Sequence, residues 1–334
     1  MYILAFETSC DDTSIAIFKN AKLIAMDTKS QIKEHSKTGG VVPEVAARLH
    51  ANNIFLVLKK VLKDSGIGLN KIDYIACTNE PGLLPSLLVG LTVAKTLSKI
   101  LNIPLILINH IQAHIFANLL ERKLNNLKFP SICLTVSGGH NEIYLWESLF
   151  KSKLIGETLD DSAGEAFDKV SKMMGLGFPG GPIISKLANE YKKPFIGIFP
   201  KVLLEKNSLN FSFSGLKSAV KREVDKKIEN GKLKIENGSG KTGKKIKNNK
   251  KLNYKYLTYE DKTEIAFEFE ETITEILTTK LFLAAKKYNI KNIVLAGGVS
   301  ANQKLKEKIK SISKKDGYNF IFPIKNIYSQ DNAA

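Results

Sequence analysis

The stretch Tyr2-Ile-Leu-Ala-Phe-Glu-Thr-Ser-Cys-Asp-Asp-Thr-Ser-Ile-Ala-Ile-Phe18 decides the fold, because two strand-like runs, 2–6 and 13–18, flank a polar loop. A second stretch repeats this plan, with strand-like runs at 131–136 and 141–146 on either side of Ser137-Gly-Gly-His140. The repeated unit predicts an internally duplicated, two-lobed fold with a central cleft. We place the lobes at residues 1–124 and 125–334.

Helical and strand-like patterns alternate through the rest of each half, which favours an α/β fold with partly parallel sheets. In the first half we expect strands at 22–27, 72–77 and 103–108, and helices at 44–62 and 86–101. In the second half we expect helices at 163–174, 183–191, 216–228, 258–287 and 300–313, and strands at 292–295 and 320–323.

The charge of the chain is strongly basic, with a formal net charge of +17. Clustered cations favour nucleic acid, but only three of the 50 basic residues are arginine, the residue suited to bidentate phosphate contacts. Residues 230–256 hold nine lysines against one glutamate. We interpret this stretch, about 230–257, as a solvated insertion in preference to an RNA-binding arm.

The chain shows no signal peptide and no apolar stretch of the roughly 18–20 residues that cross a bilayer. Its three cysteines, Cys10, Cys77 and Cys133, are scattered and lack the paired spacing of a metal site. Reduced thiols fit best. We therefore expect a cytoplasmic protein that does not bind a membrane.

Two of the five histidines, His110 and His114, directly follow the apolar run 103–108. On a helix, this spacing puts both rings on one face at the carboxyl end of a strand, where α/β sheets place ligands. Two neutral imidazoles can share a divalent ion when a carboxylate or water completes the shell. Taken alone, however, the spacing favours two capping or hydrogen-bonded histidines over a metal site.

Three glycine-rich segments could present backbone amides to an anion: 136–140, 178–182 and 296–302. In 136–140 we expect glycine to supply dihedral angles that other residues avoid. The alternatives are a tight hairpin at 136–140 and a helix break at 178–182. Ser300 would cap the helix that follows 296–302 whether or not a ligand binds there.

Carboxylates crowd two loops, at Glu7, Asp11 and Asp12 and again at Asp160 and Asp161. They could orient a ligand, hold a metal or act as a base, although most loop acids face water. No P-loop or Gly-x-Ser-x-Gly elbow is present.

Short motifs along the whole chain resemble, in order, those of the TsaD family. They lie at 6–13, 39–50, 110–114, 136–140, 164–169, 179–182, 211–217, 297–302 and 331–334. This family comprises the tRNA threonylcarbamoyladenosine transferases, formerly labelled O-sialoglycoprotein endopeptidases. The resemblance implies the two-lobed actin and sugar-kinase-like (ASKHA) ATPase fold.

The resemblance also implies an activity. The family transfers the threonylcarbamoyl group from threonylcarbamoyl-AMP to the N6 amine of the adenosine next to the anticodon, in tRNAs that read codons beginning with A, and releases AMP. The resemblance also implies that the bacterial TsaB and TsaE proteins are its partners. The alternatives are a non-catalytic scaffold subunit of the same complex and a metal-dependent glycopeptidase. The glycopeptidase lacks its obvious base, because Ile111 stands where a His-Glu-x-x-His motif needs glutamate.

By matching motifs, His110, His114 and Asp331 would hold one divalent metal per subunit, with iron(II) favoured and zinc as the alternative. Asp11 would be the catalytic or orienting carboxylate. The adenylate would contact a further set of residues: Thr135, Val136, Ser137, Gly138, Gly139, Asp168, Gly181 and Asn302.

This chain departs from the family pattern at three places. Glu80 stands where the family has a glycine, and Asn141 stands where threonine is usual. Family members also continue for a further helix beyond 331–334, so we expect a terminal helix to be missing here and Asp331 to lie close to the chain end.

Overall fold

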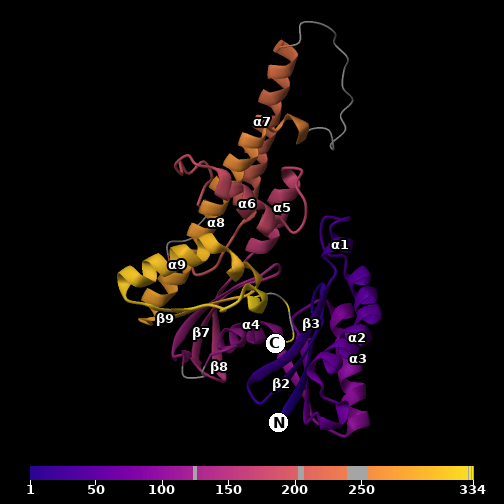
Figure 1. Ribbon diagram of the computed structural model, residues 1–334. Coiled ribbons are helices and arrows are strands. Elements are labelled where there is room, and N and C mark those ends of the chain that lie inside the picture. The colour runs from indigo at the N-terminus through magenta and orange to yellow at the C-terminus, as the bar shows by residue number, and fades with distance from the viewer. Residues whose placement is uncertain (123–125, 202–206, 239–253, 330, 332, 334) are drawn as a thin grey trace.

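The computed structural model describes residues 1–122, 126–201, 207–238, 254–329, 331 and 333 (Figure 1). Its strands form two five-stranded sheets with the orders β3-β2-β1-β4-β5 and β8-β7-β6-β9-β10. In each sheet, the first three strands along the chain pair antiparallel, and the last two add in parallel on the other side of the first strand. The two orders are the same, which confirms the predicted internal duplication.

The strands of the first sheet lie at Tyr2–Glu7 (β1), Asp12–Lys19 (β2), Lys22–Ser30 (β3), Tyr74–Glu80 (β4) and Leu105–Asn109 (β5). Those of the second lie at Ser131–Val136 (β6), Asn141–Ser148 (β7), Lys151–Glu157 (β8), Asn292–Ala296 (β9) and Asn319–Ile321 (β10). The sequence pattern missed β8. Five of its seven residues are exposed, so it lacks the apolar alternation that marks a half-buried strand.

The two long helices of the first lobe, α2 (Pro43–Ser65) and α3 (Leu84–Leu101), pack against its sheet. The short helix α1 (Ile32–His35) follows β3. Leu4 and Phe6 of β1 meet Ile54 and Val61 of α2 and Ala94 of α3 in a buried apolar cluster. Burial of these side chains is the main force that holds the helices on the sheet.

One helix among the described residues, α3, is long and apolar enough to cross a membrane by length and composition. The expectation that no stretch reaches this length is therefore wrong. Leu87 and Ala94 of α3 are buried within the lobe, and Leu84 and Leu88 are exposed.

Among its described residues, the second lobe carries five α-helices around a larger apolar core. They are α5 (Ala163–Met173), α6 (Gly180–Glu190), α7 (Ser214–Gly238), α8 (Tyr259–Lys287) and α9 (Gln303–Asp316). Figure 1 shows α7 rising away from the sheets alongside α8. Because α7 reaches Gly238, the first part of the lysine-rich stretch is helical and not a loop. Residues 239–253 of that stretch lie outside the described part of the chain.

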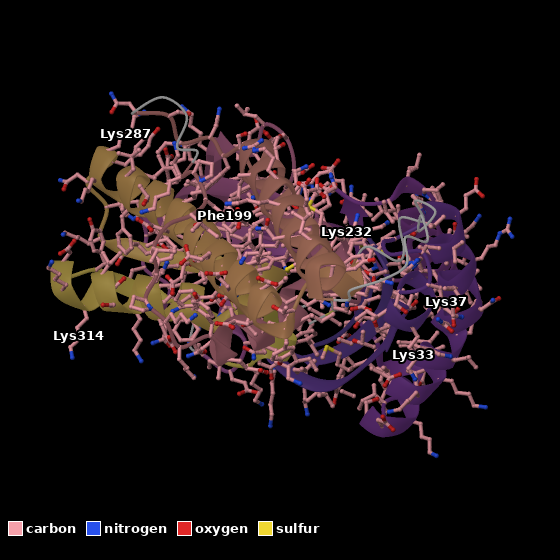
Figure 2. All side chains as sticks on the ribbon, turned by 90° about the horizontal axis from the view of Figure 1, so that it is seen from above. Lys33, Lys37, Phe199, Lys232, Lys287 and Lys314 are labelled. Atoms are coloured by element: carbon pink, nitrogen blue, oxygen red, sulfur yellow. The ribbon has the colours of Figure 1, made fainter. Side chains whose placement is uncertain are left out.

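Positive charge is distributed over both lobes. Figure 2 shows Lys33 and Lys37 at the end of the molecule formed by the first lobe, and Lys287 and Lys314 at the opposite end. All four side chains are exposed.

A short helix joins the two lobes. It is α4 (His110–Phe116), which directly follows β5 of the first sheet. Its Ile115 packs in a buried cluster with Cys133 and Trp146 of the second sheet. The residues at the start of α4 are therefore held between the two halves of the duplicated fold.

Candidate metal centre and glycine turn

The two histidines of α4 point into one small site. The helix starts at His110 because Asn109 caps it, with Oδ1 accepting the backbone N–H groups of Ile111 and Gln112 at 3.0 and 3.1 Å. The rings of His110 and His114 are both buried, and their centroids lie 4.5 Å apart. The capping role falls to Asn109, so neither imidazole is needed to cap the helix.

Asp331 completes a group of three possible ligands. Its Oδ1 lies 3.1 Å from Nε2 of His114 and 3.6 Å from Nε2 of His110. One ligand atom from each residue lies within 4.8 Å of the others. The C-terminal segment is held in place on both sides, since Ser329 hydrogen-bonds Ser300 and the N–H of Ala333 donates to Ser14 Oγ at 3.1 Å.

The geometry of this group fits a metal. Nε2 of His114 is buried and has no well-aligned hydrogen-bond partner among the described residues, although it lies 3.1 Å from Asp331. A buried nitrogen left without a hydrogen bond is costly unless another partner takes its lone pair. Two imidazole nitrogens and one carboxylate oxygen form a ligand set that iron and zinc both accept.

Charges at this site act on one another. Burial opposes ionisation of Asp331, but His110 and His114 hold the pKa of its carboxyl well below the usual range. Burial likewise opposes protonation of His110, yet Glu7 and Asp331 raise its pKa to about 9. Sequence reasoning placed Glu7 in an acidic loop but did not pair it with His110, because 103 positions separate the two residues.

Burial opposes ionisation of the other two acids of the first loop, Asp11 and Asp12. Burial, followed by repulsion from Asp331, raises the pKa of Asp11. Burial raises the pKa of Asp12 to about 7, and its Oδ1 has no hydrogen-bond partner among the described residues. Both carboxyls are therefore held in an environment that disfavours their charge.

The glycine turn of the second lobe leaves its backbone open. Ser137 Oγ accepts the N–H groups of His140 and Gly139 at 3.0 and 3.3 Å, which closes the turn. A Cβ added at Gly138 or Gly139 would meet no atom within 4 Å. Neither glycine has a positive φ, so the expectation that the turn needs glycine for its dihedral angles is wrong. Open space, and not backbone strain, distinguishes these positions.

Three other glycines bring neighbouring segments into close contact. A Cβ at Gly164, at the start of α5, would lie 2.6 Å from Ser137 O. A Cβ at Gly180, at the start of α6, would lie 2.4 Å from Phe167 O. Gly297 has a φ of +84°, and its Cβ would lie 2.5 Å from Val136 O. The start of α5 and the end of β9 therefore approach the 136–140 turn closely only because these positions lack side chains.

Asp168 lies where α5 meets the start of α6. Its Oδ1 accepts the N–H of Gly180 at 2.6 Å. Burial raises the pKa of Asp168 to about 6 despite this hydrogen bond, and the charge of Asp11 in the first lobe contributes. A Cβ at the neighbouring Gly181 would meet nothing within 4 Å. Asp168 and Gly181 thus border open space beside the amino end of α6.

Three residues of the expected adenylate set have side chains that are buried or already hydrogen-bonded within the protein. Thr135 and Val136 are fully buried strand residues. Asn302, and not Ser300, caps α9, since its Oδ1 accepts the N–H of Leu305 at 2.8 Å. The Nδ2 of Asn302 donates to Glu270 at 2.7 Å. These three residues can offer a ligand backbone groups, but their side chains are already in use.

The second acidic pair has a structural role. Asp160 accepts the N–H of Phe213 at 2.8 Å and the hydroxyl of Ser212 at 2.5 Å. Asp161 forms ion pairs with Lys217 and Lys169. Both carboxylates fix the start of α7 against the second sheet, so the 211–217 motif is explained by local packing.

Comparisons with known proteins identify the family. Residues 22–334 match the family model described as TsaD: tRNA N6-adenosine threonylcarbamoyltransferase. The tRNA N6-adenosine threonylcarbamoyltransferase of Persephonella marina is 42% identical over 327 residues, covering 97% of this chain and 85% of the relative. That of Thermosipho melanesiensis is 45% identical over 334 residues, covering 100% and 92%.

A solved structure has a related fold. Full-length HypF in its phosphate- and nucleotide-bound form is 15% identical to this chain and has a TM-score of 0.54. The match covers 99% of this chain and 44% of HypF. At this identity the likeness concerns the fold alone. The family model and the relatives show that the chain belongs to the TsaD family of tRNA N6-adenosine threonylcarbamoyltransferases.

Proposed function

We propose that this protein transfers the threonylcarbamoyl group of threonylcarbamoyl-AMP to the N6 amine of the adenosine beside the anticodon of tRNA, with release of AMP. The observation that carries the proposal is the ligand set of His110, His114 and Asp331 in a chain that belongs to this family. A non-catalytic scaffold would have no need of two buried imidazoles gathered around one carboxylate.

The adenylate would lie along the second lobe. The backbone N–H groups of Ser137, Gly138 and Gly139 are suited to its phosphate, because the turn is open to solvent and the start of α5 lies against it. Thr135 and Val136 would contribute backbone groups only. Asp168 and Gly181 would face the sugar, and Asn302 would act by fixing the start of α9.

One divalent metal, iron(II) in preference to zinc, would be held by His110, His114 and Asp331. When bound, it would supply Lewis-acid stabilisation of negative charge on the substrate. His140, the last residue of the glycine turn, is close enough to lower the pKa of Asp331. The ligand set and the phosphate-binding turn would therefore act on neighbouring parts of one substrate.

Asp11 would orient the attacking amine. Repulsion from Asp331 raises the pKa of Asp11, and repulsion from Asp11 raises the pKa of Asp168. A carboxylate close to both of these residues would lie near the metal and the nucleoside. Positioning is the main demand, because an aromatic exocyclic amine is a poor nucleophile.

We assign the fold to the two-lobed ASKHA class, with the first lobe at 1–124 and the second at 125–334. The repeated strand order of the two sheets and the likeness to HypF over 99% of the chain support this assignment.

The partners would be tRNA and the bacterial TsaB and TsaE proteins, in the cytoplasm. Exposed apolar side chains on two helices of the first lobe, Phe55 and Leu56 of α2 and Leu84 and Leu88 of α3, support a protein partner at these helices. Replacing Leu84 and Leu88 with serine should abolish co-elution with TsaB and leave metal binding unchanged. Co-elution at the unsubstituted level would place TsaB elsewhere.

A reconstituted reaction with threonylcarbamoyl-AMP, unmodified tRNA and partner proteins tests the activity. The unsubstituted chain should form modified adenosine, and the His110→Ala variant should lose at least tenfold in rate. Absence of product from the metal-loaded, unsubstituted chain would contradict the proposed function. Equal product from both chains would contradict the role of the metal site.

A further inference from the structure

Glu7 is a buried carboxylate at the end of β1, with 2% of its surface exposed. Its Oε2 lies 3.1 Å from Nδ1 of His110 and accepts the hydroxyl of Thr78 at 2.5 Å. Its Oε1 accepts the N–H of Ser9 at 2.5 Å. Both oxygens are therefore engaged by donors that favour the ionised carboxylate.

This arrangement determines which nitrogen of His110 carries a proton. Nδ1 of His110 faces Glu7 Oε2 at 3.1 Å and the Ser9 hydroxyl at 3.2 Å. An ionised Glu7 can only accept, so the Nδ1–H donates toward it. The neutral ring then has its lone pair on Nε2. Nε2 is the nitrogen that faces Asp331, at 3.6 Å.

We propose that Glu7 is a positioning residue that fixes the tautomer and the ring orientation of His110, so that Nε2 is ready to bind the metal. This inference rests on the proposed metal site and adds a residue outside its ligand set. Histidines that bind metals commonly donate their other N–H to a carboxylate, and loss of that carboxylate lowers metal affinity roughly 10–100-fold.

The loop that carries Glu7 is held rigidly by α3 and the residues before it. The N–H of Leu83 donates to Ser9 O at 2.7 Å, and Thr8 Oγ1 donates to Ser86 O at 2.9 Å. A Cβ added at Gly90 would lie 2.5 Å from Thr8 Oγ1. These contacts fix the position of Glu7 beside His110.

The test is the affinity for Zn²⁺, measured by competition with a chromophoric chelator. Glu7→Gln should lower it roughly 10–100-fold. The amide has one acceptor atom and one donor group, so it cannot accept from Ser9 on one side and from Thr78 and His110 on the other.

Glu268→Gln is the matched control. Glu268 is equally buried, and in the second lobe it accepts the backbone N–H groups of Ile196, Gly197 and Ile198. This variant should lose thermal stability and keep the unsubstituted Zn²⁺ affinity. Unchanged affinity in a folded Glu7→Gln variant would overturn the proposal.

A second measurement needs no variant. Nitrogen-15 NMR of the zinc-loaded, unsubstituted chain should show His110 protonated at Nδ1 and bound through Nε2. Binding through Nδ1, or no zinc binding, would overturn the proposal. Neither measurement uses tRNA. A chain that binds zinc in this way without transferring the threonylcarbamoyl group would refute the proposed function alone.

Discussion

The first loop of sheet one and the glycine turn of sheet two occupy the same place in the repeated unit, between its first two strands. The loop is packed with carboxylates, and Glu7, Asp11 and Asp12 all feel the cost of burial. The turn carries no charge at its two glycines, whose backbone is exposed. Duplication has kept the position and changed the chemistry, from ionic side chains to neutral amides.

Packing explains the difference. The loop is enclosed, since His50 bonds Thr13 at 2.8 Å and the carbonyl of Cys10 at 3.0 Å. Beside the turn, close contacts are made by Gly164 and Gly297, while Gly138 and Gly139 remain free of them. We infer that α4 of the first lobe, together with Asp331 of the second, holds the metal beside the acidic loop, and that the glycine turn of the second lobe holds the phosphate.

The largest effect should be on Zn²⁺ affinity, when a metal ligand beside the acidic loop is lost. His114→Ala should lower Zn²⁺ affinity by more than the roughly 10–100-fold expected for an outer partner. Chelator competition measures it. His35→Ala, which removes another buried histidine of the first lobe, is the control and should keep its affinity. Unsubstituted affinity in His114→Ala would remove this ligand from the site.

The next largest effect should be on AMP affinity, when the glycine turn of the second lobe is changed. Gly139→Val fills open space, so the free energy of unfolding should change by no more than about 0.5 kcal/mol. The Kd for AMP, measured by calorimetry, should rise at least about tenfold, or roughly 1.4 kcal/mol. Gly164→Ala should instead destabilise the fold by about 1–3 kcal/mol. Unchanged AMP affinity in Gly139→Val would show that the phosphate does not use this turn.

A smaller effect separates capping from binding. Asn302→Ala removes the cap of α9 and should cost about 1 kcal/mol of unfolding free energy, with or without AMP. Asn302→Ser, which restores a capping oxygen, should recover part of it. Urea denaturation measures both variants. A loss seen only with AMP present would mean that the side chain of Asn302 binds the ligand directly.

The acidic loop should also give the stability of the protein a dependence on pH. The pKa of Asp12 is about 7 in the folded chain, against about 3.9 when unfolded. The folded state therefore binds more protons between these values, and stability falls as pH rises through this window. Asp12→Asn removes this loss, so its stability relative to the unsubstituted chain should be higher at pH 8 than at pH 5. Urea denaturation without metal checks it, and equal differences would contradict it.

The sequence predicted the duplicated α/β plan and the histidine pair, because strand patterns and an i, i+4 spacing are local. It could not pair Glu7 with His110, a contact that depends on how β1 and α4 meet in space. Nor could it distinguish the open Gly139 from the packed Gly164, since both are glycines in polar motifs. The capping role of Asn302 was missed because α9 starts three residues later than expected.

One experiment tests most directly whether the metal and the phosphate bind at separate groups of residues. It measures the AMP and Zn²⁺ affinities of His110→Ala and Gly139→Val in parallel. The account predicts that His110→Ala loses Zn²⁺ and keeps AMP within a few-fold, whereas Gly139→Val loses AMP at least tenfold and keeps Zn²⁺. Loss of both ligands in either variant, with the fold intact, would contradict it.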